Sequence, residues 1–206
     1  MTKAAFQSEF NLNLEQCQWR PDDLHSVFTQ YDSEFYRKNQ EQFTQKYRSF
    51  WAVAKTLMPA SMIELGCRAG SAADAYISAS GASYTGIDTF ESATTPDGAL
   101  WEPYRVFVKL MKKRHFATPH LRIQNLRDLK ELPATDFVVV DAAHDYENAL
   151  ADMKLAATAD PKFIFVDDYN GDDVQRAVAE WFSTHAYQWY ARLHYNSGGI
   201  VIKLRD

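Results

Sequence analysis

The sequence predicts an α/β fold, with a mostly parallel sheet covered by helices on both faces and an antiparallel hairpin at its C-terminal end. Short apolar runs of four or five residues alternate with amphipathic helical segments, which is typical of parallel strands buried on both faces. The last two β-rich runs are joined by an Asn-Ser-Gly-Gly segment at 196–199. That segment favours a hairpin because Asn and Gly tolerate positive φ angles.

Length and composition indicate one soluble globular domain. The chain has 206 residues, of which 46% are hydrophobic and 24% charged, enough for a sizeable core. Its net charge of −5 argues against a nucleic-acid or anionic-membrane partner. The one basic cluster, at 112–115, is expected to be a solvated helix face. Because there is no apolar run of about 18 residues and no signal-peptide core at the start, we expect a cytoplasmic protein without a membrane span.

The N-terminal part is expected to differ from the rest of the chain. Residues 1–30 are polar with scattered aromatics, which predicts a loose arm with room for one short helix. Aromatic and apolar residues then recur at spacings of three and four, which predicts a helix over 31–57. The expected organisation is an arm or helical lid over 1–40 and a ligand-binding domain over 41–206. Whether the arm covers a ligand or forms a homodimer surface is left open.

The remaining elements alternate along the chain. Strands are expected at 62–65, 83–87, 121–123, 137–140 and 163–166, and helices at 69–80, 101–115, 146–157 and 174–181, with a turn-rich loop at 91–100 and a helical turn at 126–132. Right-handed crossovers bring the carboxyl ends of parallel strands to one edge of the sheet, where ligands bind. The residues that directly follow each strand are therefore the candidate site.

Two glycines follow the first strand. Gly66 and Gly70 permit a tight turn and a close backbone approach, and the next helix presents free N–H groups. A dinucleotide fingerprint needs a glycine where Arg68 stands, so a pyrophosphate pressed against this turn is disfavoured. Glu64 lies on the strand itself, an unusual place for a charge unless it meets a polar ligand. The alternative is an ordinary β–α turn.

Asp88 ends the second strand. A carboxylate at this point can accept hydrogen bonds from both hydroxyls of a ribose. The alternative is an aspartate in a surface turn.

Four segments resemble class I S-adenosylmethionine-dependent methyltransferases: IELGCRAGS, YTGIDTF, FVVVDAAHDYENALADM and IFVDDY. Among them the chain is most similar to small catechol- and macrocin-type O-methyltransferases with an Asp-x-x-His-x-Tyr segment. The resemblance covers roughly residues 43–204 and implies a Rossmann-like seven-stranded sheet. It also implies a site for the cofactor S-adenosylmethionine. The methionine part would lie against Glu64, Gly66, Gly70 and Ser71, with Asp141 beside the sulfonium. Asp88 would hold the ribose, and the adenine would lie near Thr89, Phe90 and Asn125.

Asp141 and His144 are the candidate catalytic residues. Asp141 ends the fourth strand, and His144 follows it at the mouth of the next helix. Methyl transfer is an in-line displacement that depends mainly on placement. A hydroxyl acceptor must also lose its proton, and a histidine that removes it contributes about 10²–10⁴-fold. The alternative is a helix-terminal histidine capped by Asp141 or Asp145.

The resemblance to catechol-type enzymes also implies a magnesium site. By position, its three oxygen ligands would be Asp141, Asp167 and Asp168. Such ligands suit Mg²⁺, which would lower the pKa of the acceptor hydroxyl. Neighbouring residues of a strand point to opposite sides, so Asp167 and Asp168 need a bend to reach one ion. The other interpretation is a hydrogen-bonded acidic pocket without a metal.

The expected function is therefore S-adenosylmethionine-dependent methylation of a hydroxyl or acid oxygen on a small molecule. A non-catalytic cofactor-binding scaffold is one alternative. A nicotinamide-dependent oxidoreductase is another, but the glycine spacing and the terminal hairpin count against it. A nucleic-acid methyltransferase is disfavoured because Asp141 is followed by Ala-Ala-His instead of Pro-Pro and an aromatic residue.

Overall fold

The computed structural model describes residues 1–21, 38–94, 100–115 and 119–205. Its main sheet has seven strands in the order β5–β2–β1–β6–β7–β9–β8. They are β1 (Ser61–Leu65), β2 (Ser83–Asp88), β5 (His120–Ile123), β6 (Phe137–Val140), β7 (Phe163–Asp167), β8 (Trp189–Leu193) and β9 (Gly199–Lys203). The first five are parallel, and β9 is antiparallel to both β7 and β8. The predicted parallel sheet and its C-terminal hairpin are confirmed.

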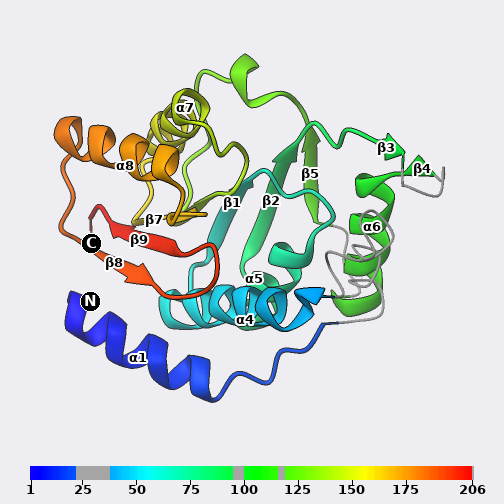
Figure 1. Cartoon of the computed structure of the whole chain (residues 1–206), viewed down its shortest axis with the longest axis horizontal. Coiled ribbons are helices and arrows are strands. Elements are labelled where there is room, and N and C mark those ends of the chain that lie inside the picture. Colours follow the sequence, from blue (N-terminus) through cyan, green and yellow to red (C-terminus); the bar gives the residue numbers. More distant parts are fainter. Residues whose placement is uncertain (22–37, 95–99, 116–118, 206) are drawn as a thin grey trace.

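The order of the strands reverses between β1 and β6. From β1 the chain goes outward to β2 and β5, then returns to the other side of β1 to form β6 (Figure 1). In open α/β sheets a ligand binds at such a reversal, outside the carboxyl ends of the strands. The fold therefore places Glu64 and the Gly66 turn next to the residues that follow β6.

Helices cover both faces of the sheet. In Figure 1, α4 (Gln40–Leu57) and α5 (Ser71–Ser80) lie on one face, with α6 (Pro103–His115) beside α5, and α7 (Tyr146–Thr158) and α8 (Asp172–Thr184) lie on the other. Alternate strand residues supply two cores. On β1, for example, Met62 packs with the α4 and α5 side, whereas Ile63 and Leu65 pack with the α7 and α8 side.

The N-terminal residues form a packed helix, where we expected a loose arm with room for one short helix. Lys3–Glu15 form the 13-residue helix α1, and Thr2 caps it by accepting a hydrogen bond from the backbone N of Ala5 at 3.2 Å. Phe6 and Phe10 are buried in the same core as Phe50 of α4. Burying two aromatic rings gives this helix a stability that its polar sequence alone would not provide. Residues 31–37, the first part of the expected helix over 31–57, lie outside the described residues.

Two connections also differ from the prediction. The expected loop at 91–100 contributes to a small two-stranded sheet of β3 (Ala93–Thr94) and β4 (Leu100–Trp101). The helical turn expected at 126–132 is limited to the short 3₁₀ helix Leu126–Asp128. Asn125 caps this short helix, because its Oδ1 accepts a hydrogen bond from the backbone N of Arg127 at 2.9 Å.

The basic cluster at 112–115 is only partly solvated. Asp74 of α5 is fully buried, and its Oδ1 lies 3.1 Å from Arg114 Nε and 2.7 Å from His115 Nε2. Trp19 Nε1 donates to the other oxygen at 2.9 Å. The prediction of a solvated face is wrong for Arg114 and His115, because both contact a buried carboxylate and the Arg114 guanidinium balances its charge. These contacts also attach the chain beyond α1 to α5 and α6.

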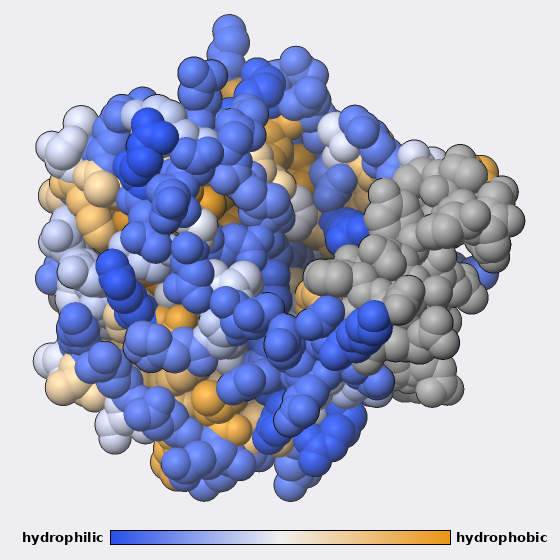
Figure 2. All heavy atoms as spheres, in the orientation of Figure 1, coloured by the Kyte–Doolittle hydropathy of each residue, from blue (hydrophilic) through white to orange (hydrophobic). Residues whose placement is uncertain are grey.

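The outer surface agrees with the polar composition. Hydrophilic residues cover most of the face seen in Figure 2, and hydrophobic residues show in separate areas between them. No helix within the described ranges combines the length and the apolar character that crossing a membrane requires.

Candidate functional site

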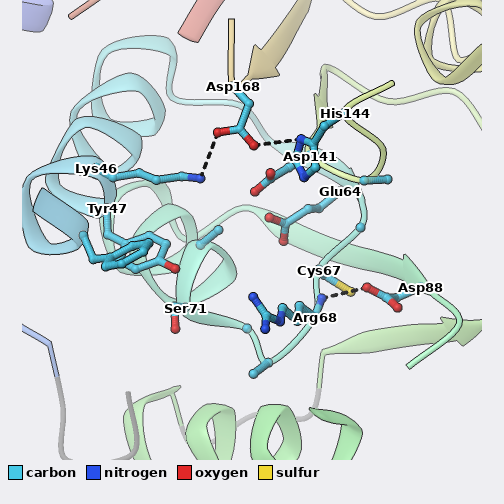
Figure 3. A pocket seen from close by; sticks show the side chains of 16 residues that line it. Lys46, Tyr47, Glu64, Cys67, Arg68, Ser71, Asp88, Asp141, His144 and Asp168 are labelled. Atoms are coloured by element: carbon cyan, nitrogen blue, oxygen red, sulfur yellow. Dashed lines mark hydrogen bonds and ion pairs between the residues drawn. The ribbon is translucent and has the colours of Figure 1, made fainter. Parts of the chain in front are cut away.

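Side chains from four strand ends and one helix surround a cavity of about 300 Å³ at the carboxyl edge of the sheet (Figure 3). The predicted residues that line it are Glu64, Gly66, Gly70, Ser71, Asp88, Asp141, His144 and Asp168, and α4 adds Phe43, Lys46 and Tyr47. The sheet therefore brings most of the predicted site together.

The turn after β1 requires both of its glycines. Gly66 and Gly70 have φ angles of +81° and +84°. A Cβ atom at Gly66 would lie 2.4 Å from the Cα of Ala142, and one at Gly70 would lie 2.7 Å from the ring of Phe107. These glycines therefore allow other parts of the protein itself, at Ala142 and Phe107, to approach the turn closely. It presses the β1 turn against the turn that follows β6.

Glu64 is fully buried on β1 beneath the cavity. Tyr84 donates a hydrogen bond to its Oε2, whereas Oε1 has no hydrogen-bond partner among the described residues. Burial raises the pKa of Glu64 to about 8, despite the hydrogen bond from Tyr84. Ser71 Oγ, at the start of α5, is likewise buried without a hydrogen-bond partner in the described chain. Two polar groups at this cavity are therefore available to a ligand.

Asp88 holds the glycine turn to the end of β2. Its Oδ2 accepts a hydrogen bond from the backbone N of Arg68 at 2.8 Å, and its Oδ1 accepts one from the backbone N of Phe90 at 2.7 Å. A carboxylate oxygen can accept more than one hydrogen bond, so Asp88 could still accept hydrogen bonds from the hydroxyls of a ribose.

A second cavity of about 340 Å³ adjoins the first and shares Gly66, Asp88 and Ala142 with it. Thr89 and Asn125 line this second cavity, and their expected places near the adenine stay predictions. Phe90 instead packs its ring against Phe107 and Tyr104, at centroid distances of 6.2 and 5.4 Å. Its predicted place at the adenine stays a prediction.

His144 forms a pair with Asp168. Its Nδ1 lies 2.8 Å from Asp168 Oδ2, and its side chain is 60% exposed at the mouth of the cavity. The hydrogen bond to Asp168 raises the pKa of His144 above its ordinary value, against the effect of partial burial. The helix that follows is capped by Asp145, whose carboxylate accepts from the backbone N of Asn148. The alternative of a capped histidine is therefore wrong, because the partner of His144 lies on another strand end.

The strand-end aspartates converge as the sequence required. One oxygen from each of Asp141, Asp167 and Asp168 lies within 4.8 Å of the others. The necessary bend occurs at Asp168, which has a φ of +53°. Burial and the neighbouring Asp167 carboxylate raise the pKa of Asp141 well above its usual range. Asp167 is fixed from the other side by the Tyr195 hydroxyl, which donates to its Oδ1 at 2.6 Å.

Sequence reasoning missed Lys46 of α4. Its Nζ forms an ion pair with Asp167 Oδ2 and lies 3.7 Å from Asp168 Oδ1. The three carboxylates raise the pKa of Lys46 above its ordinary value, although burial acts in the opposite direction. A signal was present in the sequence, because Lys46 falls three residues after Phe43 and four before Phe50, within the apolar stripe of its helix.

The donor set of the three aspartates suits Mg²⁺, but the position that the ion would take is contacted by the Lys46 ammonium. An ion and this ammonium cannot occupy the same space between Asp167 and Asp168. The residues present therefore do not fit a metal while Lys46 keeps this place.

Sequence comparisons found no relative: no family model matches the chain, and no curated protein matches it. Solved structures do match. A methyltransferase of Podospora anserina bound to S-adenosylhomocysteine has a TM-score of 0.63 at 13% identity, over 100% of this chain and 98% of that one. An O-methyltransferase of Streptomyces achromogenes involved in tomaymycin synthesis, in complex with S-adenosylmethionine, has a TM-score of 0.60 at 13% identity, over 100% of both chains. An O-methyltransferase of Bacillus cereus in complex with S-adenosylhomocysteine has a TM-score of 0.58 at 11% identity, over 98% of this chain and 100% of that one.

The chain has a methyltransferase fold. At these identities the likeness establishes the fold, and function depends on the site. Most of the predicted strand-end residues line two neighbouring cavities. Phe90 packs beside Phe107 and Tyr104, and Asp167 is reached through its ion pair with Lys46, which the sequence did not predict.

Proposed function

We propose that this protein is an S-adenosylmethionine-dependent methyltransferase that acts on an oxygen atom of a small-molecule acceptor, with His144 as the general base. The observation that carries the proposal is the His144–Asp168 pair at the mouth of a cavity that shares Gly66, Asp88 and Ala142 with a second one. The methyltransferase fold and the cofactors bound to its solved examples support the choice of ligand.

Two neighbouring cavities with shared lining residues suit an elongated ligand with chemically different ends. The acidic cavity, with Glu64 and Asp141, suits the cationic methionine end of the cofactor. Ser71 Oγ and the free N–H groups at the start of the ten-residue helix α5 suit the carboxylate of that end. Thr89 and Asn125, in the second cavity, suit the polar edge of a nucleoside.

Asp168 holds His144 in the form that can accept a proton from the acceptor. Because Asp168 accepts from Nδ1, the neutral imidazole keeps its proton on that nitrogen and leaves Nε2 free to accept another. In the transfer, a C–O bond forms to the acceptor as the C–S bond of the sulfonium breaks. S-adenosylhomocysteine leaves with a neutral sulfur, and the acceptor proton moves to His144 Nε2. No step needs a metal ion.

Calorimetric titration with S-adenosylhomocysteine, with NAD as the control ligand, tests the cofactor. We expect binding in the micromolar range and none for NAD. Asp88→Asn should weaken S-adenosylhomocysteine roughly tenfold, because a hydrogen bond to a charged group contributes about 1.5–3 kcal/mol. His144→Ala is the matched control and should keep the wild-type affinity. Absence of binding to the folded wild-type protein would contradict the proposal.

A further inference from the structure

We propose that the Lys46 ammonium is the cation of the strand-end carboxylate cluster, so that this chain fixes its acceptor site without a divalent metal. The role in methyl transfer rests on the proposed function, whereas the exclusion of a metal rests on the geometry alone.

Lys46 is held in this place from its own helix. Phe43, Tyr47 and Phe50 lie on the same side of α4, and Lys46 Nζ is 5.5 Å from the centre of the Phe50 ring. The Lys46 side chain is only 16% exposed. In Figure 3 it extends from α4 across the cavity toward Asp168, near Asp141 and Glu64. A lysine on the buried side of a helix needs a charged partner, and the cluster supplies two.

The carboxylates are in turn fixed by partners from the chain. Asp167 binds the Lys46 ammonium through one oxygen and the Tyr195 hydroxyl through the other. Asp168 contacts His144 through Oδ2 and faces Lys46 with Oδ1. Its left-handed backbone is closed by a hydrogen bond from the backbone N of Gly171 to its carbonyl oxygen at 2.9 Å. An ammonium has three donors and does not demand the octahedral oxygen shell of Mg²⁺.

Entry of a divalent ion would therefore require the loss of an established ion pair. The displaced ammonium would lose its carboxylate partners while its side chain stays beside the rings of α4, where a charge without partners is unfavourable. With Lys46 in place, Asp168 keeps the position from which it orients His144. Lys46 is thus a positioning residue that replaces an ion.

Metal titration of the chelator-treated full-length chain tests the inference. Mn²⁺ binding is followed by electron paramagnetic resonance, and Mg²⁺ binding by calorimetry. The wild type and Lys46→Arg, which keeps the charge, should bind neither ion at millimolar concentration. Lys46→Ala should gain one site and bind Mn²⁺ at concentrations roughly a hundredfold below the millimolar level at which the wild type shows no binding, because a unit charge has left the ion-pair distance of the ligands.

A matched control is Lys162→Ala. Lys162 pairs with Asp136 at 2.9 Å, at the opposite end of the strands from the site. Its loss removes a lysine–aspartate pair without touching the cluster, and it should not create a metal site.

Two results would overturn the inference. One is stoichiometric metal binding by the wild type that Asp167→Asn abolishes. The other is a folded Lys46→Ala variant that gains no site. The wild-type titration decides the first even if the variant fails to fold. Titration of the same samples with S-adenosylhomocysteine separates the two proposals, since loss of cofactor binding contradicts the proposed function and leaves the metal result unaffected.

Discussion

Asp168 Oδ2 lies 2.8 Å from His144 Nδ1, although the two residues follow different strands of the sheet. Burial alone would raise the pKa of Asp168, but the hydrogen bond from His144 and the Lys46 charge outweigh it and lower the pKa to about 2. Asp168 is therefore ionised throughout the pH range in which His144 titrates. This relationship fixes both the orientation of the imidazole and the tautomer that a base requires.

The first prediction concerns the pH dependence of methyl transfer. Only neutral His144 can accept a proton, and its pKa is raised, so the rate should increase with pH through a midpoint above 6.5. Asp168→Asn removes the negative partner and should move that midpoint to lower pH while reducing the maximum rate. Rate measurements between about pH 5 and pH 10 would show both effects. A midpoint that Asp168→Asn leaves unchanged would argue against the pair.

The second prediction concerns Glu64 and the charge of the cofactor. With a pKa of about 8, Glu64 carries a proton at neutral pH in the free protein. The sulfonium of S-adenosylmethionine favours the ionised carboxylate, so binding should release a proton, and affinity should increase as pH rises toward 8. Binding of S-adenosylhomocysteine, which has a neutral sulfur, should release fewer protons. Calorimetry in buffers of different ionisation enthalpy counts the protons. Equal counts for the two ligands, or a Glu64→Gln variant with the wild-type count, would contradict this role.

The same pKa has a consequence for stability. The folded-state pKa of Glu64 is above its ordinary value of 4.5. The folded state therefore binds more protons than the unfolded state between pH 4.5 and about 8, and the Glu64 contribution to the free energy of unfolding should decrease across that window. Denaturant titrations of the wild type and Glu64→Gln at several pH values would measure this, and the wild type should lose stability relative to Glu64→Gln as pH rises from 4.5 to about 8.

The third prediction separates backbone strain from steric clash at the glycine turn. Gly66 and Gly81 both have positive φ angles, but a Cβ at Gly81 would meet nothing within 4 Å, whereas one at Gly66 would meet Ala142. Gly81→Ala should cost about 1–2 kcal/mol in the free energy of unfolding, from backbone conformation alone. Gly66→Ala should cost clearly more and weaken cofactor binding as well. Urea denaturation compares them, and equal losses would mean that the contact with Ala142 relaxes easily.

The fourth prediction concerns the buried Asp74. Asp74→Ala leaves Arg114 and His115 without their carboxylate and should reduce the free energy of unfolding by about 3–5 kcal/mol. Arg176→Ala, which removes the exposed pair of Arg176 with Asp173, is the control and should cost less than about 1 kcal/mol. Thermal and urea denaturation would measure both. Similar small losses in the two variants would show that Asp74 does not attach α5 to α6.

Local signals predicted the sheet and most of the site. Each parallel strand is a short apolar run, and parallel topology places the residues after such runs at one edge. That rule alone predicted that Glu64, Asp141 and His144 lie at the same edge of the sheet, before any contact between side chains was known. It also placed Asp168 there, but it could not show whether the carboxylate faces an ion or a histidine.

The contacts that were missed are long-range pairings. Lys46 lies in a helix before β1 and contacts Asp167 and Asp168 at the end of β7, and spacing along the chain does not predict such a contact. Arg114 and His115 looked like surface charges because their partner, Asp74, lies in another helix. The sequence allowed for a short helix in the N-terminal arm but did not predict the length or the packing of α1, because Phe6 and Phe10 stand among polar residues and stabilise the helix only through the core.

Methyl transfer from labelled S-adenosylmethionine to a panel of hydroxylated and acidic small molecules is the decisive measurement for His144 as the base. We expect the wild type to label an acceptor oxygen, His144→Ala to lower the rate by about 10²-fold or more, and His120→Ala, which changes an exposed histidine on β5, to leave the rate unchanged. All three proteins should bind S-adenosylhomocysteine with the wild-type affinity. Transfer by His144→Ala at the wild-type rate would show that His144 is not the base.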